Sequence, residues 1–124
     1  MNDDLRQTLG RTGEQLAADH LARLGYVIVE RNYRTRCGEL DIVARDGPAL
    51  VFCEVKTRRE GGSAGGPLEA VGRGKQMRVR KMAGLWLVDH RDRPYAARLR
   101  FDVIAITVDG RGCLTTLEHL EGAF

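Results

Sequence analysis

The sequence predicts one α/β domain in which two helices flank a single mixed β-sheet. Three observations indicate this fold. The chain has 124 residues, about the length of one domain. Its 43% hydrophobic and 30% charged residues are typical of a folded globule. Helix-like and strand-like apolar spacings alternate in the order α-β-β-β-α-β-β. We therefore treat residues 1–124 as a single domain.

Two segments have the spacing of amphipathic helices. Residues 8–24 place leucine and alanine at helical intervals, and the following Gly25 is a natural helix stop. Residues 74–90 carry an apolar stripe at i, i+3, i+4, i+7 and i+8. Trp86 belongs to that stripe, so we expect it in the core and not on a surface that stacks nucleic-acid bases.

Five segments have strand character, and they cover residues 26–31, 39–45, 50–57, 98–108 and 113–117. Short turns join the first three, which predicts an antiparallel meander. The second helix is long enough to act as a crossover that returns the fourth strand parallel to the sheet. Residues 34–38 are expected to form a basic connection, and the glycine-rich residues 58–67 a mobile loop.

Positive charge is concentrated in the middle of the chain. Residues 1–55 have a net charge of −2, residues 56–100 of +8 and residues 101–124 of −3. Arginine supplies 17 of the 20 basic residues, and its planar guanidinium matches phosphate with two hydrogen bonds. This distribution favours a polyanionic partner such as nucleic acid, although a solvated basic surface would give the same pattern.

Other compositional features exclude several protein classes. The three cysteines are widely spaced and odd in number, which argues against a disulfide framework and against a zinc site. The three histidines show no metal-ligand spacing, and we interpret them as ordinary surface or edge residues. The polar N-terminus does not resemble a secretory signal, and no apolar run is long enough to cross a bilayer. We expect a cytoplasmic protein without membrane contact.

The hairpin around Asp46-Gly47-Pro48 carries the most informative side chains. Alternation places Glu39 and Asp41 on one face of the first strand, and Glu54 and Lys56 on the same side of the second. The opposite side chains of both strands look like core. A two-residue loop would pair Glu39 with Glu54, whereas a four-residue loop would pair Asp41 with Glu54. Pro48 cannot donate a ladder hydrogen bond, which favours the longer loop.

Opposed carboxylates of this kind repel unless one is protonated or a cation lies between them. Carboxylate oxygens suit Mg²⁺ or Mn²⁺. The ammonium of Lys56 would then orient a water molecule and stabilise charge that develops on a phosphate. Together these groups are what metal-dependent hydrolysis of a phosphodiester requires. The simpler interpretation is an ordinary sheet surface with a Glu54–Lys56 pair.

The chain also resembles a known family. It is similar to the YraN-like predicted endonucleases of the PD-(D/E)xK nuclease superfamily, which are related to archaeal Holliday junction resolvases. The matching motifs are Gly13-Glu14, Arg31-Asn32-Tyr33-Arg34, Gly38-Glu39-Leu40-Asp41, Phe52-Cys53-Glu54-Val55-Lys56-Thr57-Arg58, Pro67-Leu68-Glu69-Ala70-Val71, Lys75, Arg100-Phe101-Asp102-Val103 and Ala123-Phe124. They cover nearly the whole chain, and they imply a restriction-endonuclease-like fold.

This resemblance implies roles for individual residues. Asp41 and Glu54 would be metal ligands, Lys56 the catalytic lysine, and Glu14 would reach from the first helix to complete the site. Leu40 stands where the superfamily pattern has proline, a departure that the YraN-like family tolerates. Glu39 points to the acidic side and offers a substitute ligand. The kinship with junction resolvases further implies a homodimer, because a symmetric junction suits a symmetric protein.

A second group of residues is predicted to bind nucleic acid. Its members are basic and lie near the acidic hairpin or on the second helix: Arg34, Arg58, Arg59, Lys75, Arg78 and Lys81. Lys75, Arg78 and Lys81 recur at steps of three, which places them along one side of that helix. A solvated helix face explains this row equally well. Tyr33 is a candidate for base stacking, and Asp102 is expected to pair with an arginine or to support the site from behind.

The function expected from these features is Mg²⁺- or Mn²⁺-dependent cleavage of structured or branched DNA, in DNA repair or recombination. The alternative is a non-catalytic nucleic-acid-binding module on the same fold, serving as an accessory to a repair complex. A third possibility is an adaptor protein with a coincidental acidic hairpin, against which the basic central segment argues.

Overall fold

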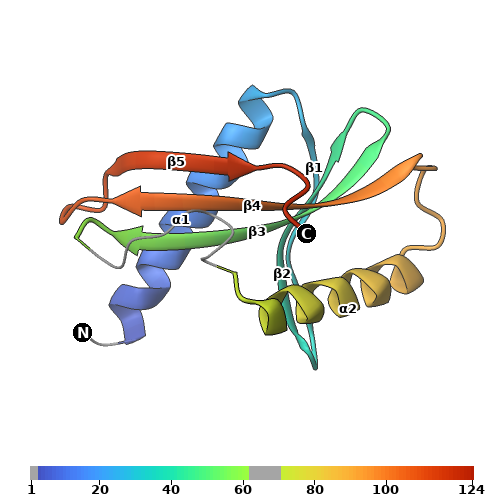
Figure 1. Ribbon diagram of the computed structural model, residues 1–124, viewed down its shortest axis with the longest axis horizontal. Helices are drawn as coiled ribbons and strands as arrows, with labels where there is room; N and C mark the ends of the chain where they lie inside the picture. The colour runs from blue at the N-terminus through green and yellow to red at the C-terminus, as the bar shows by residue number, and fades with distance from the viewer. Residues whose placement is uncertain (1–2, 62–70) are drawn as a thin grey trace.

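The elements of the structure follow the predicted order. The computed structural model describes residues 3–61 and 71–124. The elements are α1 (Asp3–Arg23), β1 (Val27–Thr35), β2 (Gly38–Asp46), β3 (Ala49–Arg59), α2 (Arg73–Asp89), β4 (Arg98–Val108) and β5 (Leu114–Leu120). The strands form one five-stranded sheet in the order β1-β2-β3-β4-β5. The predicted α/β domain with a mixed sheet and two helices is confirmed (Figure 1).

The sheet topology follows from the lengths of the connections. β1, β2 and β3 pair antiparallel, as the short turns between them require. β3 and β4 pair parallel along their full length, from Ala49 opposite Arg98 to Arg59 opposite Val108. α2 lies in the connection between these two strands and acts as the predicted crossover. β5 returns antiparallel to β4 and ends the sheet.

The two helices bury opposite faces of the sheet. On one face, Ala17, Ala18 and Leu21 of α1 pack against apolar side chains of the strands. On the other face lies a second core cluster, which includes Leu40, Val43, Leu50, Phe52, Val79, Met82, Ala83 and Trp86. Figure 1 shows α1 crossing behind the central strands, whereas α2 runs beside β2. Trp86 is 1% exposed, so its prediction as a core residue is confirmed.

Several predicted boundaries differ from the structure. The expected connection over residues 34–38 is largely strand, because β1 extends through Thr35 and pairs Arg34 with Glu39. Arg58 and Arg59 lie at the end of β3 and not in a loop, since both pair with β4. In each case cross-strand hydrogen bonds override the local composition. Most of the predicted glycine-rich loop lies outside the described residues.

The hairpin register is the one predicted with the longer loop, but the predicted loop length is wrong. Asp46 pairs with Ala49, which leaves Gly47 and Pro48 as a two-residue turn. Arg45 pairs with Leu50 and Ile42 with Cys53, where the pairing of the two strands ends. Continued by one residue, this register would put Asp41 opposite Glu54.

The predicted face assignment is wrong in part. Leu40 does not share a core face with Ile42 and Ala44, which pack in the cluster against α1, but packs with Val43 against α2. In a regular strand, residues 40 and 43 would point to opposite faces. The alternation of side chains along β2 is therefore interrupted next to Asp41.

A buried polar network joins β4 to β5 and to the C-terminal residues. Asp102 is fully buried and accepts hydrogen bonds from Arg100 Nε at 2.9 Å and His119 Nε2 at 2.8 Å. His119 Nδ1 lies 3.0 Å from His20 Nε2 of α1. Asp102 therefore pairs with an arginine, which confirms one of the two roles predicted for it. The histidines were interpreted as ordinary surface or edge residues, and His119 does lie on the edge strand β5. What that interpretation lacked is the contacts of His119 with Asp102 and His20.

Within the part of the chain that the structure describes, neither α1 nor α2 combines the length and the apolar character needed to cross a membrane.

Candidate metal centre

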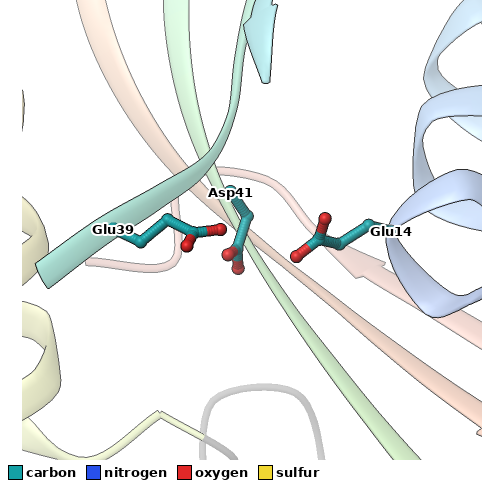
Figure 2. Close-up of side chains that lie close together, drawn as sticks. All are labelled: Glu14, Glu39 and Asp41. Carbon is teal, nitrogen blue, oxygen red and sulfur yellow. The ribbon is translucent and has the colours of Figure 1, made fainter. Parts of the chain in front are cut away.

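Three carboxylates from two distant segments converge at one end of the sheet. Glu14 extends from α1, whereas Glu39 and Asp41 extend from β2. Each offers an oxygen atom that lies within 4.8 Å of an oxygen of the other two. Figure 2 shows Asp41 between Glu39 and Glu14, with the carboxylates directed toward one another. We call these three residues the acidic cluster.

Asp41 occupies the point at which β2 separates from β3. The described backbone pairing between the two strands ends at Ile42 and Cys53. One residue farther along, Asp41 Oδ2 accepts a hydrogen bond from the backbone N–H of Val55 at 2.8 Å. The side chain thus takes over a backbone hydrogen bond of the sheet, which fixes its position. Beyond it β2 turns away from β3, so the carboxylates lie where the sheet opens (Figure 1).

The position of Glu14 depends on a close helix–strand contact. Its neighbour Gly13 lies against β3, and a Cβ added to Gly13 would fall 1.7 Å from Thr57 Oγ1. A larger residue at position 13 would force α1 away from the sheet. An atom closer than 3.0 Å requires its neighbour to move, and the short side chain of Thr57 cannot move aside. Gly13 therefore lets α1 approach closely enough for Glu14 to reach Asp41.

Asn32 lies between two members of the acidic cluster. Oriented to satisfy both acids, its side-chain nitrogen donates to Glu14 Oε2 at 2.8 Å and to Glu39 Oε1 at 2.7 Å. Its backbone has φ 56°, a left-handed conformation that asparagine tolerates better than most residues. The flanking pairs Arg31–Ile42 and Tyr33–Leu40 put Asn32 opposite Asp41. Asn32 thus holds Glu14 and Glu39 beside Asp41.

Glu54 is a buried carboxylate with one unpaired oxygen. It is 7% exposed, and its Oε1 lies 3.3 Å from Nζ of Lys75 on α2. Its Oε2 is buried and has no hydrogen-bond partner among the described residues. A buried unpaired carboxylate oxygen is costly, and such an atom is commonly explained by a missing ion or water.

The electrostatics of the site favour protonation or cation binding. Burial, followed by repulsion from Glu54, raises the pKa of Asp41 to about 8. Burial raises the pKa of Glu54 as well, although the Lys75 ammonium opposes this effect. Burial and the neighbouring Glu39 raise the pKa of Glu14. A divalent cation would relieve the same repulsion that raises these pKa values.

The donor set suits a hard divalent cation. Every candidate ligand is a carboxylate oxygen, which is the donor that Mg²⁺ and Mn²⁺ prefer. Asp41 and Glu54 are the predicted ligands, and the unpaired Glu54 Oε2 is an available donor. Glu14 and Glu39 add oxygens within the acidic cluster. The residues therefore fit the predicted metal, and the structure brings Glu14, whose role the resemblance implied, to Asp41.

The predicted basic residues divide into two groups. Lys75 has a side chain that is 38% exposed, and its ammonium lies 3.3 Å from Glu54 Oε1, so it contacts a candidate ligand. Arg34 lies at the edge of the acidic cluster, with its Nε 3.2 Å from Glu39 Oε2. The remaining predicted residues belong to β3 and α2, and their side chains are exposed or partly buried: Lys56, Arg58, Arg59, Arg78 and Lys81. Their proposed catalytic or nucleic-acid-binding roles stay predictions.

Sequence reasoning missed three contributions to this site. Asn32 and the spacer role of Gly13 were noted only as parts of matching motifs, and Lys75 was assigned to nucleic-acid binding. The positive φ of Asn32 and the close approach at Gly13 depend on tertiary packing. The motif Gly13-Glu14 could have indicated this contact. A glycine inside a helix lowers the stability of the helix, so it suggests that close packing requires it.

Comparison with known proteins assigns the family. A model of the uncharacterised protein family UPF0102 matches residues 13–106, which include every member of the acidic cluster, Glu54 and Lys75. The chain belongs to the UPF0102 family. This is the YraN-like family that the sequence motifs resembled.

UPF0102 proteins from several bacteria match almost the full chain. The relative from Streptomyces griseus is 50% identical over 117 residues, covering 94% of this chain and 96% of the relative. The one from Acidothermus cellulolyticus is 50% identical over 131 residues, with 96% and 95% coverage. A third, from Syntrophus aciditrophicus, is 46% identical and covers 100% of this chain and 92% of its own length.

Proposed function

We propose that this UPF0102 protein is a metal-dependent endonuclease of the PD-(D/E)xK type that binds structured or branched DNA and hydrolyses its phosphodiester bonds. The observation that supports it best is the acidic cluster of Glu14, Glu39 and Asp41, with Glu54 close enough to Asp41 to raise its pKa. Among the described residues, the buried Glu54 Oε2 has no hydrogen-bond partner. Such a cluster gives no stability to the fold by itself, since like charges in a buried site repel. A site that is costly to maintain favours a functional role.

Each residue of the site receives a distinct role in this proposal. Asp41 and Glu54 would hold Mg²⁺ or Mn²⁺, and Glu14 would assist them from α1. The bound ion would supply Lewis-acid polarisation of the phosphate and a more acidic water. Lys56, two residues after Glu54 on the same strand, would orient the attacking water. Water adds to phosphorus, and one P–O bond to a sugar oxygen breaks.

Exposed basic side chains would position the DNA backbone. Arg78 and Lys81 are exposed on α2, and Arg34 and Arg59 are exposed on β1 and β3. Neutralising Arg78 and Lys81 together should lower the slope of log Kd against log salt by up to about 0.9 for each lost phosphate contact. An unchanged slope would show that α2 does not contact the backbone.

A cleavage assay on defined DNA shapes tests the activity. The pure protein is incubated with a four-way junction, a flap, a linear duplex and single strands, with Mg²⁺ or Mn²⁺. The matched control is the double variant Asp41→Asn, Glu54→Gln. Cleavage that disappears in this variant supports the proposal and identifies the preferred shape. Asp41→Asn alone should abolish cleavage while DNA binding stays equal or becomes tighter, because a negative charge near phosphate is lost.

Metal binding is tested separately by thermal unfolding. Mg²⁺ or Mn²⁺ that binds the native site should raise Tm of the wild-type protein and leave the double variant unchanged. DNA binding without cleavage under either metal would favour the non-catalytic accessory module. Neither a metal-dependent shift nor DNA binding would favour an adaptor protein.

The remaining predictions concern partners and location. The homodimer implied by kinship with junction resolvases, a repair-complex partner and a cytoplasmic location stay predictions. Sedimentation of the pure protein with and without a four-way junction measures the oligomeric state directly.

A further inference from the structure

A groove lies between the end of the β1–β2 hairpin and the outer side of α2. Its volume is about 420 Å³, which falls within the range of pockets that hold small ligands. Tyr33, Arg34 and Cys37 line it from the hairpin, and Lys81 and Leu85 from the helix. Lys81 and Leu85 are four residues apart, so they lie next to each other on one face of α2.

The walls of the groove provide a flat aromatic surface. The hydroxyl of Tyr33 donates a hydrogen bond to Asp89, and its ring packs edge-to-face against His90 with centroids 6.0 Å apart. These two contacts hold the ring in one orientation. Leu85 is 39% exposed and adds apolar surface on the opposite wall. An aromatic face with an apolar neighbour is the surface on which unpaired bases stack in single-strand-binding proteins.

The rim of the groove is basic. Arg34, Arg36 and Lys81 line it and are exposed, whereas Asp89 is the one acidic lining residue within residues 3–61 and 71–124. The Asp89 carboxylate accepts the hydrogen bond of Tyr33, so part of its capacity is already used. Arg34 is paired with Glu39, so Arg36 and Lys81 provide most of the positive charge. Apolar walls with a basic rim are complementary to a ligand that combines a flat ring with phosphate groups.

The groove borders the candidate metal centre. Arg34 lines the groove, and its Nε lies 3.2 Å from Glu39 Oε2 in the acidic cluster. A phosphate chain that leaves the groove past Arg34 therefore arrives at the carboxylates. A base within a duplex has both faces covered by its neighbours, so only an unpaired base can offer a face to Tyr33.

We propose that this groove binds an unpaired nucleotide of a nucleic-acid strand next to the metal centre, and that the protein prefers substrates with a single-stranded segment over continuous duplex. This inference deepens the proposed nuclease function and rests on it for the meaning of the neighbouring carboxylates. Binding in the groove needs no metal, so it can be measured apart from cleavage.

The three free cysteines provide a direct probe of groove occupancy. Cys37 lines the groove, Cys113 is exposed on the turn before β5, and Cys53 is 2% exposed. The full-length protein in EDTA is alkylated with N-ethylmaleimide, with and without a 15-residue oligothymidylate, and each cysteine is followed by peptide mass spectrometry. We expect the oligonucleotide to slow alkylation of Cys37 at least fivefold and to leave Cys113 unchanged.

Probe oligonucleotides and variants then identify what the groove recognises. An abasic chain of the same length and a blunt duplex should protect Cys37 much less than oligothymidylate. Tyr33→Ala should abolish protection, whereas Tyr33→Phe, which keeps the ring, should retain it. Tyr95→Ala is the matched control, because Tyr95 is 85% exposed and lies outside the groove. Lys81→Gln on the exposed face of α2 gives a second test if Tyr33→Ala fails to fold.

The outcomes separate the two proposals. Equal protection by duplex, abasic chain and oligothymidylate would overturn the inference, since phosphates alone would then explain binding. Absence of protection while the wild-type protein cleaves DNA would overturn it and leave the nuclease proposal intact. Protection of Cys37 in a protein that cleaves nothing under either metal would support the groove and contradict the nuclease.

Discussion

Gly13 of α1 lies against Thr57 of β3 so closely that a Cβ on residue 13 would fall 1.7 Å from the threonine hydroxyl oxygen. This contact joins the helix that carries Glu14 to the strand that carries Glu54. The distance between these two acids is thus set by a residue that has no side chain.

Replacing this glycine should therefore affect both fold and site. Gly13→Ala should lower the free energy of unfolding by about 1–3 kcal/mol through overpacking, and it should weaken the Mg²⁺-induced rise in Tm. Gly84→Ala is the matched control, because Gly84 lies in α2 with no atom within 4 Å of an added Cβ. It should stabilise the protein by about 0.5–1 kcal/mol. Urea unfolding of both variants measures this contrast, and equal effects would contradict the packing argument.

Metal-free protein should become less stable as the pH rises. The pKa of Asp41 is raised by burial and then by Glu54 to about 8, well above its value in an unfolded chain. The folded protein then binds this proton more tightly than the unfolded chain does. The free energy of unfolding therefore contains a favourable contribution at low pH, which is lost as the pH rises through the folded pKa. Between pH 6 and pH 9 in EDTA, the loss should be on the order of 1 kcal/mol or more.

Asp41→Asn isolates this effect, because the amide does not ionise. Its stability should fall less over the same pH range in urea unfolding experiments. A wild-type protein whose pH dependence equals that of the variant would show that Asp41 is not the group that titrates.

Lys75 and Arg78 lie on the same helix but should behave differently. Lys75 contacts Glu54 at 3.3 Å, whereas Arg78 is exposed. Lys75→Gln removes a positive charge beside the candidate ligands, so Mg²⁺ should bind a few-fold more tightly, a gain of about 1 kcal/mol or less after solvent screening. Arg78→Gln should leave the Mg²⁺ titration unchanged. Following Tm against Mg²⁺ concentration distinguishes the two, and identical curves would place Lys75 outside the site.

The buried Asp102 should be structural and independent of the metal centre. It is fully buried and accepts hydrogen bonds from Arg100, His119 and the backbone N–H of Gly122. Burial raises its pKa, but the hydrogen bonds from His119 and Arg100 outweigh this and leave the pKa below its usual value. Asp102→Asn should cost about 3 kcal/mol, because the Arg100 guanidinium would lose its buried partner.

The control for this variant is Glu118→Gln on the exposed side of β5, which should change the stability by less than about 0.5 kcal/mol. The Mg²⁺-induced shift of Tm should survive in Asp102→Asn. Loss of that shift would connect the network to the metal centre.

Patterns along the chain predicted much of this structure. Apolar spacing located both helices, and the residues around Pro48 favoured the register in which Arg45 pairs with Leu50. These features are local, because strand register follows from the turn and helical faces follow from a repeat of 3.6 residues. The strand ends were less predictable. Arg34 and Arg58 belong to strands because partners across the sheet satisfy their backbone groups.

The order of elements, the mixed sheet and the presence of acids on one hairpin follow from patterns within the sequence. Which side chains meet at the hairpin depends on tertiary packing. Asn32 donates hydrogen bonds to both Glu14 and Glu39, and the Lys75 ammonium forms an ion pair with Glu54. Both contacts join segments far apart in the chain, and they depend on how closely α1 and α2 pack on opposite sides of an opening sheet. Periodicity reports which face of an element is apolar, but it carries no information about the distance between two elements.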